Sequence, residues 1–156
     1  MPVSLILSTG LWLNVLTAVV ALPQQEARDL AHELLTTGAA LFDKHDAAAM
    51  ASSFMENGEI QMLLKQQDGS GFKRDARTGR TAIQEGYAEV FKNVTPEMRS
   101  RNVVESARYI GNDLLEISGT FTPNVDKPDD SVPFVQVRVR NGGAWKIQSV
   151  HIYVLK

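Results

Sequence analysis

The chain has 156 residues, 44% of them hydrophobic and 22% charged, a composition typical of a globular protein with one buried core. Its formal net charge of −2 argues against a nucleic-acid-binding protein, because such proteins carry a dominant basic surface. The chain has no cysteine, which excludes disulfides, thiolate catalysis and thiolate metal sites.

The N-terminal segment is apolar and uncharged: the first charged side chain is Glu26, and residues Leu11 to Leu22 precede it. That length fits the hydrophobic region of a secretory signal peptide and is too short to span a bilayer. Val19 and Ala21 are small residues suited to a cleavage site before Leu22. We therefore expect residues 1–21 to be a signal peptide of a secreted or periplasmic protein, with no stable membrane span after processing. An uncleaved anchor and a core helix are the alternatives.

Residues 25–156 contain no repeat, linker or low-complexity tract, so we expect them to form one domain. Leucines and alanines at helical spacing predict an amphipathic helix from Ala27 to Asp43. Asp46 is placed to cap a short second helix, which Asn57-Gly58 would end. The stretch "EIQMLLKQ" then alternates between apolar and polar residues, which predicts a strand.

The second half of the chain is expected to contain one helix and two hairpins. The segment "FKRDAR" is a polar strand or a loop, and Thr81 with Gln84 forms a capping box for a third helix. Four strands are predicted after it: Val103–Ile110, Leu114–Phe121, Phe134–Arg140 and Trp145–Leu155. Grouped helices and consecutive antiparallel hairpins indicate an α+β fold with the helices packed on one face of a curved sheet.

The apolar side of the last strand changes partway along it. The apolar residues occupy odd positions first and even positions later: Trp145, Ile147, Val150, Ile152 and Val154. A β-bulge near Gln148-Ser149 would place them all on one face, because an extra residue moves every later side chain to the other face. His151 would then point to the opposite face. Without a bulge, His151 would share the face of Trp145.

Four segments resemble the NTF2-like superfamily, and within it SnoaL-like or DUF4440-like domains. They are "LFDKHDAAAMASSFMENGEI", "TGRTAIQEGYAEVF", "YIGNDLLEISGTF" and "VQVRVRNGGAWKIQSVHIYV". The resemblance implies a cystatin-like α+β cone, in which N-terminal helices pack on a strongly curved, mostly antiparallel sheet around a conical pocket. It also implies a homodimer formed through the sheet, as in many members.

The superfamily includes isomerases, cyclases, dehydratases and hydrolases as well as non-catalytic domains, so the fold does not determine the function. The isomerases need a carboxylate base and a protonated acid. Their positions correspond here to Met62 and to Val135 or Gln136, which cannot act as either. Only Tyr87 matches a pocket tyrosine of the isomerases, so the sequence disfavours isomerase chemistry.

The candidate ligand-binding residues are those expected in or beside the cone: Tyr87, Phe91, Met62, Phe54, Arg138 and His151. Leu34, Val137 and Ile152 would complete the lining. On its strand, Arg138 shares a polar side with Gln136 and Arg140, which favours an exposed or interface face. The minority interpretation is that Arg138 and His151 together bind a carboxylate.

His151 is the only candidate catalytic residue, because an imidazole can act as an acid or base near neutral pH. A packing or interface role is the alternative. The three histidines lack a metal-binding spacing, so we expect no metal and no cofactor.

We therefore expect a secreted or periplasmic protein that binds a small apolar or weakly acidic molecule in its cone without strong catalysis. One alternative is an enzyme of the cyclase, dehydratase or hydrolase type that uses His151 with Arg138 and Tyr87. The other is an interaction domain that dimerises through its sheet.

Overall fold

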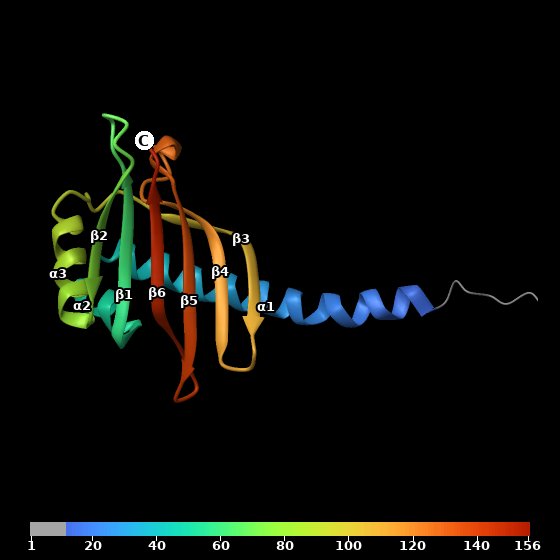
Figure 1. Ribbon diagram of the computed structural model, residues 1–156. Coiled ribbons are helices and arrows are strands. Elements are labelled where there is room, and N and C mark those ends of the chain that lie inside the picture. Colours follow the sequence, from blue (N-terminus) through green and yellow to red (C-terminus); the bar gives the residue numbers. More distant parts are fainter. Residues whose placement is uncertain (1–11) are drawn as a thin grey trace, which may run out of the picture.

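The protein is described by a computed structural model that covers residues 12–156, with side chains from residue 23 onward (Figure 1). Residues 1–11, the first part of the predicted signal peptide, lie outside this range. The helices are α1 (Trp12–Asp43), α2 (Ala47–Ser52), α3 (Arg80–Phe91) and the short 3-10 helix η1 (Pro128–Asp130). The strands are β1 (Phe54–Lys65), β2 (Phe72–Thr78), β3 (Arg101–Ile110), β4 (Leu114–Thr122), β5 (Val132–Asn141) and β6 (Ala144–Val154).

The six strands form one sheet in the order β2-β1-β6-β5-β4-β3. All neighbours are antiparallel except β1 and β6, which pair in parallel. Figure 1 shows α1 crossing behind the sheet, with α2 and α3 beside β2 and β1. The predicted α+β order is confirmed, with helices packed against a curved, mostly antiparallel sheet.

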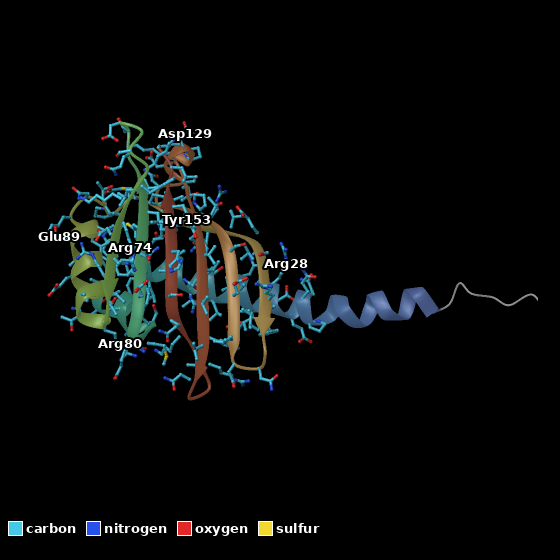
Figure 2. All side chains as sticks on the ribbon, in the orientation of Figure 1. Arg28, Arg74, Arg80, Glu89, Asp129 and Tyr153 are labelled. Carbon is cyan, nitrogen blue, oxygen red and sulfur yellow. The ribbon has the colours of Figure 1, made fainter. Side chains whose placement is uncertain are left out.

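Helix α1 is held against β3 by its small residues and by one arginine. Ala27 and Ala31 are completely buried, and their small side chains allow the helix to approach the strands closely. The guanidinium of Arg28 donates a hydrogen bond of 3.0 Å to the carbonyl of Glu105 (Figure 2). The N-terminal half of α1 projects beyond the β3 edge of the sheet (Figure 1). The packed part of the helix therefore begins near Ala27.

The predicted cap of α2 is confirmed, but its predicted end is wrong. The carboxylate of Asp46 accepts a hydrogen bond of 2.9 Å from the backbone N–H of Ala49. The helix already ends at Ser52, and Asn57-Gly58 lie inside β1, where the register with β6 shifts. A larger residue would be crowded at Gly58, because an added Cβ would lie 3.0 Å from the carbonyl oxygen of Ile147.

The predicted capping box of α3 does not form. The helix begins at Arg80, and its N-cap is Gly79, which has a φ of 85° that favours glycine. Its carbonyl accepts the first helical hydrogen bond from Ile83, at 3.0 Å. The β1–β2 hairpin fixes this start, because Gly79 donates to the Gly58 carbonyl and Arg80 donates to the Phe54 carbonyl.

The bulge predicted in the last strand is confirmed, and it lies at Gln148. Val137 of β5 pairs with Ser149, whereas the next residue, Arg138, pairs with Ile147. Gln148 is therefore the extra residue of β6. Beyond it, Val150 is 7% exposed and faces the helices together with Ile147, which is 5% exposed.

The two faces of the sheet differ in what covers them. The face that packs against the helices is called the inner face, and on β5 it carries Phe134, Gln136 and Arg138, all buried. The opposite face is called the outer face, and on β5 it carries Val135, Val137 and Val139, all half-buried. Because side chains alternate along a strand, this assignment fixes the face of every paired residue on the neighbouring strands.

The close approach of β3 to β4 predicts that Gly119 tolerates no side chain. A Cβ at this position would lie 2.1 Å from the carbonyl oxygen of Val103, so we expect Gly119→Ala to reduce the free energy of unfolding by about 2 kcal/mol or more. Gly38, inside α1, has no atom within 4 Å of its added Cβ. Gly38→Ala should therefore stabilise the protein by about 0.5–1 kcal/mol, the usual gain from replacing a glycine inside a helix. Urea denaturation measures the free energy of unfolding of both variants. If the two substitutions changed it by similar amounts, this account would be contradicted.

Candidate functional site

Arg138 is buried on the inner face, at the centre of the sheet. Its exposed fraction is 5%, and that of its neighbour Gln136 is 6%. The residues paired with Arg138 on the adjacent strands are Leu115 and Ile147, both buried and apolar. The prediction that favoured an exposed or interface face for Arg138 is therefore wrong, because the polar side of β5 faces the helices.

The guanidinium of Arg138 has few partners for a buried cation. Its Nε donates a hydrogen bond of 2.6 Å to Oε1 of Gln136, and its Nη1 donates a long one of 3.4 Å to the carbonyl of Trp145. Within residues 23–156, no carboxylate lies within 4.0 Å of it. Burial lowers the pKa of Arg138 to about 10, so the group still carries its charge at neutral pH.

Tyr87 of α3 supplies a second polar group on the same side of the sheet. Burial raises the pKa of its phenol, and the positive charge of Arg138 opposes this effect, which places the two groups within Coulombic reach of each other. The phenol therefore stays protonated at neutral pH. The ring of Tyr87 stacks on Phe91 with their centroids 5.9 Å apart, and Phe91 meets Phe42 edge-on at 5.1 Å.

Several apolar side chains that pack on the core are not fully covered. Besides Tyr87, they are Leu30, Leu34, Ile60, Phe121, Trp145 and Ile152. Met62 is paired with Ile152 on the inner face and is also half-buried. Phe54, by contrast, is completely buried and belongs to the closed part of the core. Apolar side chains that are only partly covered therefore lie on the same side of the sheet as Arg138 and Tyr87.

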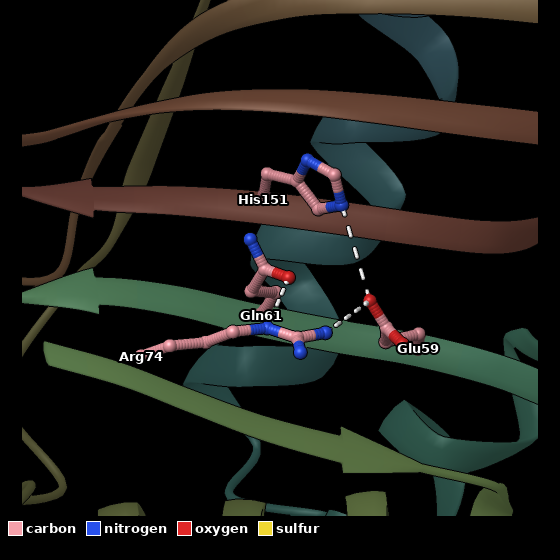
Figure 3. A network of polar contacts seen from close by, with 4 residues as sticks. All are labelled: Glu59, Gln61, Arg74 and His151. Atoms are coloured by element: carbon pink, nitrogen blue, oxygen red, sulfur yellow. Dashed lines mark hydrogen bonds and ion pairs between the residues drawn. The ribbon is translucent and has the colours of Figure 1, made fainter.

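His151 lies on the outer face, away from Arg138 and Tyr87, because the bulge at Gln148 precedes it. Its Nε2 is 4.0 Å from a carboxylate oxygen of Glu59, which also contacts Arg74 at 3.7 Å (Figure 3). Arg74 in turn donates a hydrogen bond of 2.6 Å to Gln61. Figure 3 shows this network in front of the strands, with the helix behind them.

Two of the proposed arrangements therefore do not assemble. Arg138 and His151 cannot bind one carboxylate together, because they lie on opposite faces of the sheet. For the same reason His151 cannot serve as an acid or base beside Tyr87. Val137, expected in the lining, is also on the outer face, since it alternates with Arg138. Tyr87, Phe91, Met62 and Arg138 remain together on the helix side, and their role as ligand contacts stays a prediction.

One signal in the sequence could have placed Arg138 correctly. The turn Gly142-Gly143 pairs Arg140 with Trp145, and residues paired in this way lie on the same face. Arg138, two residues before Arg140, must then share the apolar face of Trp145. The alternation within β5 alone could not reveal this, because it does not say which of the two faces is covered.

His45 was not singled out from the sequence, and no motif marks it. It lies between α1 and α2 with a φ of 55°, and its ring centroid is 5.3 Å from that of Phe91. Its Nε2 is buried and has no hydrogen-bond partner within the described side chains. Histidine is one of the residues that adopt this backbone region more readily.

Two shallow surface clefts lie away from the group formed by Tyr87 and Arg138. One, of about 540 Å³, opens at the start of α3 and is lined by Glu56, Thr78, Gly79, Arg80, Thr81, Ala82 and Glu85. The other, of about 580 Å³, lies at the hairpin ends and is lined by Glu26, Tyr109, Gly111, Asn112, Arg140 and Trp145.

Within the part of the chain that the structure describes, no group of three or more metal-ligating side chains comes together, and no helix is long and apolar enough to cross a membrane.

Comparison with known proteins gives matches in structure but none in sequence. No family model matches the chain, and no curated protein matches it. A cystatin-like domain of unknown function from Nostoc punctiforme superposes with a TM-score of 0.61 at 12% identity, covering 82% of this chain and 76% of that one. An NTF2-like protein from Novosphingobium aromaticivorans with a cystatin-like fold gives 0.57 at 18% identity, covering 90% and 88%. An NTF-2-like protein of unknown function from Shewanella oneidensis gives 0.61 at 15% identity, covering 81% and 98%.

At such identities the likeness is one of fold. The chain therefore has the NTF2-like, cystatin-like α+β fold that the resemblance implied.

Proposed function

We propose that this protein binds a small, mainly apolar molecule between its helices and the inner face of the sheet. The observation that supports the proposal is the group of apolar side chains on the helices and on the inner face that pack on the core and yet remain partly exposed, on the same side of the sheet as Tyr87 and Arg138. Apolar surface with a few convergent polar groups is the usual composition of a small-molecule site.

The energetics favour an apolar ligand body. Burying apolar surface contributes about 25 cal/mol per Å², so a ligand that covers Leu34, Ile152 and Met62 gains affinity without any specific contact. The polar pair would orient the ligand rather than supply most of the binding energy. The ligand is therefore small, apolar over most of its length, and polar or weakly acidic at one end.

The proposal is a binding function without strong catalysis, as for a non-catalytic SnoaL-like domain. An acid–base reaction needs a titratable group with a pKa near neutrality beside the ligand. His151 lies on the outer face, and no carboxylate within residues 23–156 contacts Arg138. These observations favour binding over the enzyme hypothesis that relied on His151.

Filling the inner surface should block binding. We expect the full chain to bind the neutral fluorescent probe N-phenyl-1-naphthylamine, and Ile152→Trp to weaken this binding about 10-fold or more, because the larger ring occupies the partly open space. His151→Gln, one residue earlier but on the outer face, is the matched control and should leave the affinity unchanged. Fluorescence titration measures both. If both variants bind as the wild type does, the ligand does not occupy the inner face.

We also infer that the chain forms a homodimer through its outer face, which is the second candidate function. The observation that favours it is a stripe of half-buried apolar side chains on this face: Leu63, Val135, Val137, Val139 and Tyr153. The charged residues Glu59, Arg74 and His151 lie beside this stripe. Tyrosine and arginine next to apolar residues form a composition common at protein interfaces.

The dimer is tested by its mass in solution. Light scattering coupled to gel filtration should give twice the mass of one chain, and Val137→Lys should convert the dimer to a monomer because it places a charged side chain in the apolar stripe. Val125→Lys, in an exposed loop position, is the control and should remain dimeric. A wild-type monomer at micromolar concentration would contradict the inference.

For localisation, we propose that the protein is secreted or exported to the periplasm with its first 21 residues removed. Two features support this. Pro23 lies inside α1, where a proline weakens the helix, and the first buried side chain among residues 23–43 is that of Ala27.

Processing is tested by the mass of the protein recovered from cell fractions of its own host. We expect the secreted or periplasmic fraction to contain a chain that begins at Leu22. Ala21→Arg should prevent this cleavage, because the position before the cut requires a small residue. An intact N-terminus confined to the cytosolic fraction would contradict the proposal.

A further inference from the structure

The charge of Arg138 has no counter-charge in the described part of the molecule. Removing a cation from water costs several kcal/mol unless an anion or a full set of hydrogen bonds compensates for it. Arg138 is 5% exposed, it has one short hydrogen bond, to neutral Gln136, and no carboxylate within residues 23–156 lies within 4.0 Å. An anion that contacts this guanidinium would therefore offset part of the free-energy cost of burying its charge.

We propose that the guanidinium of Arg138 receives a single carboxylate of the bound molecule, so that the ligand is an amphipathic monocarboxylate. This inference rests on the proposed binding function and adds the chemical class of the ligand to it. The ligand would place its carboxylate at Arg138 and its apolar body along Leu34, Met62 and Ile152.

The hydrogen bonds of Arg138 leave the required donors free. Gln136 accepts from Nε, which fixes the plane of the guanidinium. Nη1 makes only a long bond of 3.4 Å to the carbonyl of Trp145, and Nη2 makes none within residues 23–156. The two Nη groups of an arginine match the two oxygens of a carboxylate, and such charge-assisted pairs are about twice as strong as neutral hydrogen bonds.

The surroundings of Arg138 favour one negative charge rather than two. Its neighbours on the adjacent strands, Leu115 and Ile147, are apolar, and Gln136 is neutral. The Tyr87 phenol stays protonated because burial raises its pKa, so it can donate a further hydrogen bond to a carboxylate oxygen. The other arginine on the same side of β5, Arg140, is exposed at the hairpin end. A phosphate monoester would therefore leave one of its charges uncompensated and buried.

The test compares three probes that share a ten-carbon chain: decanoate, decan-1-ol and decyl phosphate. Each displaces N-phenyl-1-naphthylamine from the full chain at constant ionic strength and neutral pH. We expect decanoate to bind about 10-fold or more tightly than decan-1-ol, since a hydrogen bond to a charged group contributes about that factor. Decyl phosphate should bind more weakly than decanoate.

The variants test whether a preference for decanoate over decan-1-ol depends on Arg138. Arg138→Met removes the charge and keeps an apolar chain of similar length, so decanoate and decan-1-ol should bind with affinities within about two-fold of each other. Arg138→Lys keeps the charge but loses the planar pair of donors, and should retain part of the preference. Arg140→Met is the matched control on the same strand and should retain all of it. If Arg138→Met does not fold, Arg138→Lys and Gln136→Leu decide the question, since both should reduce the preference.

The outcomes separate this inference from the proposed function. Equal binding of decanoate and decan-1-ol by the wild type, or an undiminished preference in Arg138→Met, overturns the inference and leaves the binding function standing. Tighter binding of decyl phosphate overturns the assignment to a carboxylate. Failure of all three probes and of N-phenyl-1-naphthylamine to bind overturns the binding function, and this inference with it.

Discussion

The extra residue at Gln148 is the constraint on which the arrangement of both faces depends. It shifts the register of β6 by one residue, so that Val150 and Ile152 face the helices as Ile147 does. Without it, every side chain after Gln148 would point to the opposite face, and His151 would lie against the helices. The bulge thus keeps the inner side of β6 apolar along its whole length and leaves His151 on the outer face.

Arg138 lies on the inner face of the sheet and His151 on the outer face, and the two side chains affect the stability of the fold differently. His151 and Arg74 contact Glu59 on a partly exposed surface, where ion pairs of this kind contribute little to stability. Arg138 lies among apolar side chains, where its charge opposes folding unless it is compensated. The carboxylate of the proposed ligand would compensate this charge.

The inner and outer faces also suit different functions, and the two candidate functions therefore do not compete. A small ligand would occupy the partly exposed apolar surface of the inner face. A second copy of the chain would cover the stripe of half-buried apolar side chains on the outer face. The single sheet lies between them, so the residues that contact a partner would be neighbours in sequence of those that contact a ligand. Val137 and Arg138 are an example.

The amino-acid sequence by itself determined the element order, the cap at Asp46 and the bulge in the last strand. Each of these follows from local patterns: hydrophobic periodicity, a capping side chain, and a change of apolar side within one strand. It misplaced the end of α2 and the start of α3, because hydrogen bonds with distant strands fix both regions and no local pattern records them. Ile147 of β6 donates to the Ser53 carbonyl at the end of α2, and Gly79 and Arg80 donate to carbonyls of β1.

Only the tertiary structure decided which side of β5 is buried. Alternation shows that a strand has a polar and an apolar side, but the covered side depends on which strands pair and where the helices cross. The pairing of Arg138 with Ile147 and Leu115 therefore placed the arginine in the core, beside a tyrosine from a helix about 50 residues earlier in the chain. That proximity between distant segments is what defines the candidate site, and no local sequence pattern contains it.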